Sequence, residues 1–166
     1  MTKKIIAISI VLVLIFSFCA CSSQQQNEEN TTENTTEQAV VKVDLQKLYD
    51  ACVAKMPEMI SLDSEMMLNF CGIKAEDCAE SYVSICADSL RADEIWLIKV
   101  KDVNSVQTIE TLAKSRIQAK ADESITYSPE QHAIVQKAEI IIQGEYIAVI
   151  VSPDVSAITE IINNAF

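Results

Sequence analysis

Apolar side chains follow three different patterns along the chain. They are almost continuous from Ile5 to Phe18, absent from Ser22 to Gln38, and periodic from Val40 onward. The first run spans 14 residues, too few for a membrane-crossing helix, which needs about 20, but typical of the apolar core of a signal peptide. Lys3 and Lys4 precede this run as the basic start of such a signal. The pattern therefore predicts a leader, a polar segment and one folded region.

The first half of the folded region predicts two helices. Apolar residues from Leu45 to Met56 recur at i, i+3, i+4, i+7, i+8 and i+11, which is the spacing of one helix face. Asp44 is placed to cap this helix, and Pro57 is placed to end it. A shorter helix is expected to begin around residues 63–64 and to end at Gly72.

The second half predicts two strand pairs and three further helices. Glu94–Lys101 is nearly continuous in apolar residues, which favours a central strand covered on both faces. Ser128-Pro129-Glu130-Gln131 combines a helix cap, a proline at the first helical position and the glutamine of a capping box. The expected elements are strands 82–87, 94–101, 140–143 and 146–152, and helices 103–121, 129–138 and one starting at Ser152-Pro153.

The order α-α-β-β-α-α-β-β-α predicts an α+β domain. Its sheet is expected to be mainly antiparallel and four-stranded, built from two hairpins and packed with helices. The expected organisation is a lipoprotein signal peptide over residues 1–20, a lipidated cysteine and disordered tether over 21–39, and a single globular domain over 40–166. Because 49% of all residues are apolar, the domain can bury a core of ordinary size.

The end of the leader carries the clearest functional signal. Phe18-Cys19-Ala20-Cys21 resembles the lipobox of bacterial lipoproteins, in which a bulky apolar residue and two small ones precede the acylated cysteine. We therefore expect Cys21 to be the lipidated N-terminus. Residues 22–38 are all Ser, Gln, Asn, Thr or Glu, so they are expected to form a tether of roughly 20–25 Å. Cleavage after Cys19, which gives a free secreted protein, is the alternative.

Composition excludes several classes of partner and ligand. Thirteen Lys and Arg stand against 24 Asp and Glu, for a net charge of −11. Such a charge repels nucleic acid and anionic lipid headgroups, so no nucleic-acid partner is expected. The chain has only two glycines and lacks the GxGxxG, P-loop and HExxH patterns. We therefore expect no nucleotide or other cofactor.

Four stretches of the folded region together resemble one known family. They are Val43-Asp44-Leu45 with Leu48-Tyr49, Ala92-Asp93-Glu94-Ile95 leading into Lys99-Val100-Lys101-Asp102, Tyr127-Ser128-Pro129-Glu130-Gln131, and Gly144-Glu145-Tyr146 running to Val151-Ser152. In order and spacing they resemble the bacterial lipoprotein family known as domain of unknown function 4358, over about Val43 to Phe166. The resemblance implies a small lipid-anchored extracytoplasmic domain. It assigns no catalytic residue, and the domain's cysteines are not part of the family pattern.

The folded region contains four cysteines, Cys52, Cys71, Cys78 and Cys86. Cys52 lies on the apolar face of the first predicted helix, where a thiol acts as a small hydrophobe. The other spacings match neither CxxC redox pairs nor zinc sites. Free thiols are therefore favoured. Because an exported protein permits disulfides, a Cys71–Cys78 bond is the first alternative.

Histidine and the acidic residues give weaker signals. His132 is the only histidine and has no nucleophile in a catalytic context, so a place on a surface helix is expected. The acidic clusters lack the alternating Asp and Gly pattern of Ca²⁺ loops. They are expected at solvated turns and helix starts: Asp63 and Glu65; Glu76, Asp77 and Glu80; Asp88, Asp93 and Glu94.

These observations favour a non-enzymatic binding or accessory module at the cell envelope. The anchor would hold it on the extracytoplasmic face of the cell membrane, where it would contact a protein or a small ligand. The alternative is an enzyme whose site is assembled from dispersed acids or from the thiols of Cys71, Cys78 and Cys86. No catalytic or metal-binding constellation can be identified from the residue pattern.

Overall fold

The computed structural model describes residues 42–166. The predicted signal peptide, the lipidated Cys21 and the tether lie outside the described residues. The elements are α1 (Leu45–Val53), β1 (Met59–Ser61), α2 (Ser64–Cys71), a 3₁₀ turn (Ala75–Asp77), β2 (Cys78–Cys86), β3 (Glu94–Val100), a second 3₁₀ turn (Val103–Ser105), α3 (Val106–Tyr127), α4 (Pro129–Val135), β4 (Glu139–Gln143), β5 (Tyr146–Val151) and α5 (Val155–Ala165).

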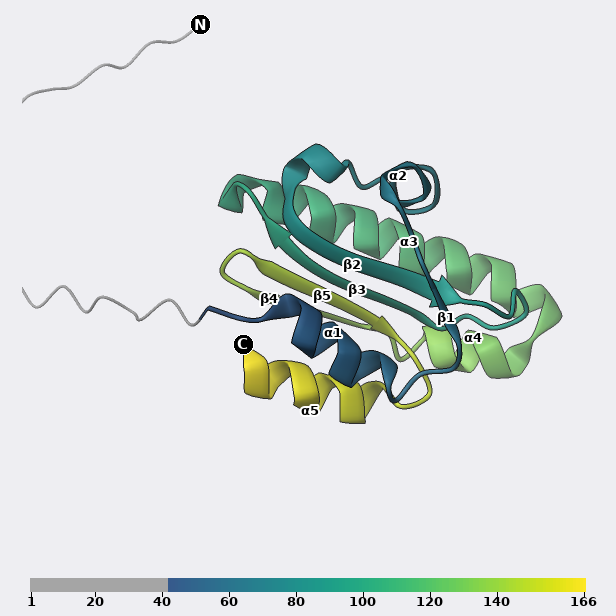
Figure 1. Cartoon of the computed structure of the whole chain (residues 1–166). Helices are drawn as coiled ribbons and strands as arrows, with labels where there is room; N and C mark the ends of the chain where they lie inside the picture. The colour runs from purple at the N-terminus through teal and green to yellow at the C-terminus, as the bar shows by residue number, and fades with distance from the viewer. Residues whose placement is uncertain (1–41) are drawn as a thin grey trace, which may run out of the picture. The chain divides into compact units, whose positions relative to one another are not determined.

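A five-stranded antiparallel sheet organises these elements in the order β1-β2-β3-β5-β4 (Figure 1). The α+β class and the two hairpins are confirmed, since β2 pairs with β3 and β4 pairs with β5. The prediction of four strands is wrong because it omitted β1, which pairs with residues 84–86 of β2. A strand of three residues is too short to show alternation, so only its partner reveals it.

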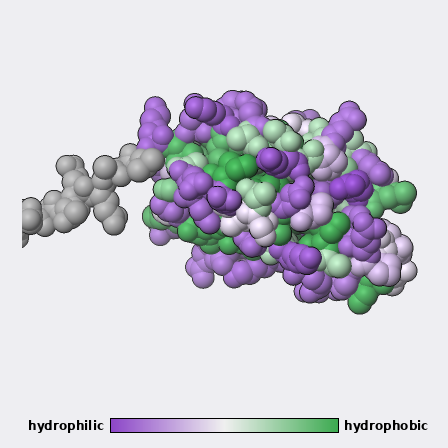
Figure 2. All heavy atoms as spheres, turned by 90° about the horizontal axis from the view of Figure 1, so that it is seen from below, coloured by the Kyte–Doolittle hydropathy of each residue, from purple (hydrophilic) through white to green (hydrophobic). Residues whose placement is uncertain are grey.

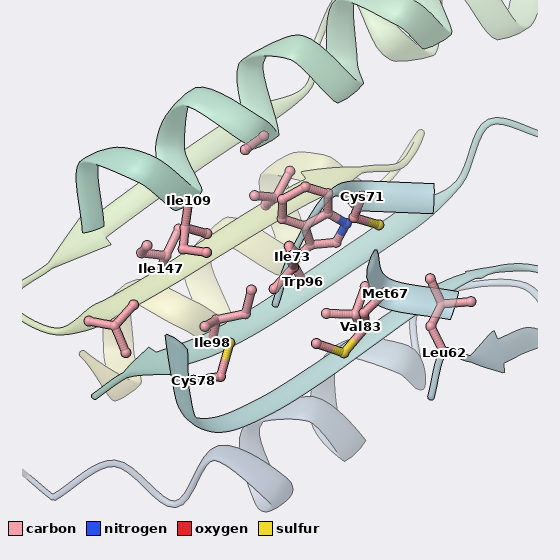
Figure 3. Packing of buried hydrophobic residues seen from close by; sticks show 13 residues of the cluster. Leu62, Met67, Cys71, Ile73, Cys78, Val83, Trp96, Ile98, Ile109 and Ile147 are labelled. Atoms are coloured by element: carbon pink, nitrogen blue, oxygen red, sulfur yellow. The ribbon is translucent and has the colours of Figure 1, made fainter. Parts of the chain in front are cut away.

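The central strand β3 separates two hydrophobic cores. The helices α2 and α3 lie on one face of the sheet, and α1 and α5 lie on the other (Figure 1). Trp96 and Ile98 belong to the core under α2 and α3, whereas Ile95 and Leu97 belong to the core under α1 and α5. Figure 3 shows the first core, with the Trp96 ring close to Cys71 of α2. All four β3 side chains are fully buried. The prediction of a central strand covered on both faces is confirmed.

Local capping signals place several helix ends as predicted. The carboxylates of Asp44 and Asp63 each accept a hydrogen bond from the backbone N–H three residues further on, at 3.0 Å and 2.9 Å. Gly72 ends α2 in the left-handed conformation, with φ of 73°. These ends depend on side chains next to the backbone groups that they satisfy, which is why the sequence predicts them.

Several element limits differ from the predicted ones. The helix α4 ends at Val135 rather than Ala138, and α5 begins at Val155 rather than at Ser152-Pro153. The first helix, α1, ends at Val53 rather than Met56. The strand β2 begins at Cys78 rather than Tyr82, because an irregular register between Cys78 and Glu80 interrupts the alternation of side chains. The helix α3 continues to Tyr127, six residues beyond its predicted end at Ala121. Small buried residues in its last turns allow α4 to pack closely on it.

The face formed by α1 and α5 is seen in Figure 2, where hydrophobic atoms are exposed between hydrophilic ones. A depression of about 330 Å³ is lined by both helices and includes Leu48 and Ile161. Its charged lining residues, Lys42, Asp44 and Lys47, are all exposed. None of them is held in a fixed position by a buried partner, which distinguishes this depression from the pocket described next.

Candidate functional site

Glu94, the first residue of β3, has a buried side chain. Its neighbour Asp93 is buried as well, although both acids were expected at a solvated turn. That expectation is wrong: only 1% of Glu94 is exposed. A buried carboxylate is costly unless charges and hydrogen bonds compensate it, so the surroundings of these two acids define a site.

Three side chains bind the Glu94 carboxylate directly. Trp96 Nε1–H donates to Oε1 at 2.7 Å. The Arg116 guanidinium of α3 donates from Nε and Nη2, with its shortest contact at 3.0 Å to Oε2. The Lys120 ammonium, one turn further along α3, lies 2.9 Å from Oε2. The carboxylate is therefore paired with two cations at once.

The charges of this network shift pKa values in a consistent way. Burial by itself would raise the pKa of Glu94, but Lys120 and Arg116 outweigh burial and hold it below its ordinary value. Burial by itself would lower the pKa of Arg116, but its hydrogen bonds to Glu94 raise it above the usual range. Glu94 and Arg116 are therefore both charged at neutral pH, and the lowered pKa makes the Glu94 carboxylate a weak base.

Arg91 and Asp93 form a second pair next to the first. Arg91 Nε and Nη2 donate to the two carboxylate oxygens of Asp93 at 3.0 Å and 3.3 Å. Hydrogen bonding to Asp93 raises the pKa of Arg91. The Asp93 side chain is fully buried, whereas 36% of the Arg91 side chain is exposed. The acid therefore fixes the position of a guanidinium that reaches the surface.

The backbone between β2 and β3 is also tied to the helices. Lys120 Nζ donates to the Ala92 carbonyl at 3.1 Å, and Gln131 Oε1 accepts from the Ala92 N–H at 2.8 Å. The predicted capping box is therefore wrong for Gln131, whose side chain holds this loop instead of the start of α4. Ser128 does cap α4, accepting from the Gln131 backbone N–H at 3.2 Å.

A pocket of about 240 Å³ opens beside these pairs. Its walls come from α2, β2, the loop before β3 and α3. The lining residues that matter here are Phe70, Arg91, Arg116, Lys120, Glu123 and Tyr127. Three cations and one acid thus line a pocket in a chain whose net charge is −11.

The sequence analysis did not predict this pocket, although the sequence contains one feature that points to its buried ion pairs. Arg116 and Lys120 are spaced i, i+4 on one helix face, a like-charge pair that is unfavourable without an acid between them. The motif Ala92-Asp93-Glu94-Ile95 supplies that acid. Which cation meets which acid depends on how α3 lies across the sheet, and this is a property of the fold.

The four cysteines of the described domain are free and buried. Cys71 Sγ lies 4.0 Å from Glu94 Oε1, and burial together with the Glu94 charge raises the pKa of its thiol to about 12. Burial raises the pKa of Cys52 to about 11 and raises that of Cys78 as well. Such thiols are protonated at neutral pH and are weak nucleophiles. The Cys71–Cys78 disulfide is not formed in this structure and stays a prediction for an alkylation measurement.

The other candidate residues have structural contacts. His132 Nδ1 lies 3.0 Å from the Ala121 carbonyl, which joins α4 to α3. Asp63 caps α2. Within residues 42–166, no three His, Cys, Asp or Glu side chains are grouped so that they could hold a metal ion.

Comparison with known proteins identifies the family of the chain. In the described part of the chain, no helix combines the length and the apolar character needed to cross a membrane. No curated protein and no solved structure matches the chain. The family described as Domain of unknown function (DUF4358) matches residues 51–152, a stretch that contains every residue of the pocket. The chain belongs to this family.

Proposed function

We propose that the protein is a lipid-anchored module on the extracytoplasmic face of the membrane, and that it binds a ligand in the pocket between α2, α3 and the β2–β3 loop. Three observations in the sequence support the anchor: a 14-residue apolar run, the lipobox-like Phe18-Cys19-Ala20-Cys21, and a polar stretch of 17 residues after it. The tether would let the domain meet partners at a short distance from the membrane.

The single observation that carries a binding role is the fixed pair of guanidinium groups at the pocket wall. Arg91 and Arg116 are each held by a buried carboxylate, so little conformational entropy is lost when they contact a ligand. Catalysis has less support. The buried acid is already paired with cations, and the thiols of Cys71 and Cys78 have raised pKa values. An enzyme built on these acids or thiols is therefore the weaker candidate.

The anchor is tested by substituting the lipobox cysteines. Cys21→Ser should release the protein from the membrane fraction and remove the mass of the diacylglycerol and acyl groups. Cys19→Ser is the matched control, because serine is small enough for the middle position of a lipobox; this variant should stay membrane-bound. A wild-type protein that is soluble and lacks lipid would refute the anchor.

The binding role is tested on the same membrane-extracted protein. Thermal unfolding is measured with and without small anionic compounds, and a ligand that binds only the folded state raises the midpoint. Lys47→Gln, which changes the α1/α5 face, should leave any such rise unchanged. A rise that Lys47→Gln abolishes would locate binding away from the proposed pocket.

A further inference from the structure

Both guanidinium groups at the pocket retain hydrogen-bond donors that no residue in the described part of the chain uses. A guanidinium has five N–H donors, and the bonds of these two groups to residues 42–166 use only Nε and Nη2. Among residues 42–166, Nη1 of Arg91 and of Arg116 has no hydrogen-bond partner. Their side chains are 36% and 22% exposed, so these remaining donors are available to a ligand in the pocket.

Apolar side chains stand beside the cations. Phe70 at the end of α2 and Tyr127 at the end of α3 are each 48% exposed and line the pocket, together with the half-buried Ile85 of β2. Two half-exposed rings next to fixed donors suit a ligand that has both a flat apolar part and an anionic part.

We infer that the pocket binds a small organic carboxylate that carries a flat apolar group. The carboxylate would accept hydrogen bonds from the free donors of Arg91 and Arg116, and the apolar group would lie against Phe70 and Tyr127. The inference rests on the proposed binding function and adds the chemical class of the ligand. A guanidinium fork matches either a carboxylate or a phosphate, and the two exposed rings favour an anion that carries a flat apolar group over inorganic phosphate. A pocket of about 240 Å³ limits the ligand to a small molecule.

Four probes separate the parts of this inference. Phenylacetate has both features, acetate has only the anion, phenylacetamide has the ring without the charge, and inorganic phosphate is a different oxyanion. Binding to the full-length, membrane-extracted protein is measured by saturation-transfer NMR for the three organic probes. Isothermal titration is used for all four, with the detergent alone as the blank. Phenylacetate should bind with a Kd of about 1 mM, as expected for a ligand of its size, and the other three should bind at least about tenfold more weakly.

Substitution of Glu123 is expected to strengthen binding, an effect that a folding defect cannot produce. Glu123 is the one acid in the lining, and it is exposed, so Glu123→Gln should strengthen phenylacetate binding about threefold by removing a repulsive charge. Asp122→Asn is the matched control, because this neighbouring acid is also exposed but does not line the pocket. It should change the affinity by less than about 1.5-fold.

The walls are tested separately. Phe70→Ala and Tyr127→Ala should each weaken phenylacetate binding about fivefold without changing the weak binding of acetate. Arg116→Lys keeps a positive charge next to Glu94 but removes the unused guanidinium donors. This variant should therefore bind both phenylacetate and acetate more weakly.

The inference is overturned if phenylacetamide binds as well as phenylacetate, or if Glu123→Gln leaves the affinity for phenylacetate unchanged. Tighter binding of phosphate than of phenylacetate would also overturn it, since the pocket would then select another oxyanion. Membrane attachment through Cys21 is measured independently of these probes. The ligand class can therefore fail while the anchored module stands, and the anchor can fail while carboxylate binding is retained.

Discussion

The charge of Glu94 should be a major source of stability, and Glu94→Gln tests this directly. The substitution keeps the size of the side chain but removes the negative charge between Arg116 and Lys120. Both cations are largely buried, with 22% and 12% of their side chains exposed. Removing one partner of a buried ion pair costs about 3–5 kcal/mol. The residual exposure of the two cations places the expected loss near the lower limit, about 3 kcal/mol.

The measurement uses the only tryptophan of the chain. Trp96 is fully buried and donates to Glu94, so its fluorescence reports unfolding of the core. A loss of about 3 kcal/mol should lower the urea midpoint by about 1.5 M, given the slope typical of a domain of this size. Glu110→Gln is the matched control, because it removes a half-exposed i, i+4 ion pair with Lys114. The free energy of unfolding of Glu110→Gln should fall by less than about 0.5 kcal/mol relative to wild type.

The pH dependence gives a second readout with a defined sign. The folded-state pKa of Glu94 lies below its ordinary value of 4.5. Its ionisation therefore stabilises the fold fully above about pH 4.5, and this contribution is lost as the pH falls through the lower, folded-state pKa. The difference in stability between wild type and Glu94→Gln should shrink below pH 4.5. A loss below about 1 kcal/mol at neutral pH, or a difference that is the same at pH 3 and pH 6, would refute the reasoning.

Three further predictions concern parts of the domain outside the ion pairs. Gly72→Ala should cost about 2 kcal/mol, because φ is 73° and the added Cβ would lie 3.0 Å from Leu112 Cδ2. Gly144→Ala, with φ of 57° but nothing within 4 Å, should cost about half as much in the same urea assay; equal losses would contradict the role of the contact. Gln131→Ala should cost about 1–2 kcal/mol, since it leaves the buried Ala92 N–H without its partner, and amide exchange at Ala92 should accelerate; an unchanged exchange rate would contradict the role of this bond. The four described cysteines should resist iodoacetamide at pH 8 in the native state and react fully in denaturant, because they are buried free thiols; a mass that shows fewer than four reactive thiols in denaturant would indicate a disulfide.

Local chemistry explains which parts of the fold the sequence predicted well. The caps at Asp44 and Asp63 and the end of α2 at Gly72 depend on residues beside the backbone groups that they satisfy. The apolar run of β3 predicted a central strand because a strand covered on both faces has no polar side. Both hairpins followed from short connections between strands.

The misses share the opposite property, because each depends on a partner far away in the chain. The short strand β1 exists through its pairing with β2. Gln131 was expected to cap its own helix but binds Ala92, which lies 39 positions earlier. Glu94 was expected at a solvated turn, yet Arg116 and Lys120 of α3 make its burial possible. Residue types alone do not reveal these pairings.

By itself, the sequence determined the class of the domain, most of its elements and the family resemblance, because periodicity, caps and motif order are local and add up along the chain. It also supports the predicted anchor at Cys21, which depends on a short contiguous motif. Only the tertiary structure decided where charge is buried. By laying α3 across the sheet, it brings Arg116 and Lys120 onto Glu94, next to the Arg91–Asp93 pair, and it leaves the unused guanidinium donors beside two aromatic rings. The contacts of Glu94 with Arg116 and Lys120 join residues more than 20 positions apart, such as the 22 that separate Arg116 from Glu94, and contacts of this kind form only when the chain is folded.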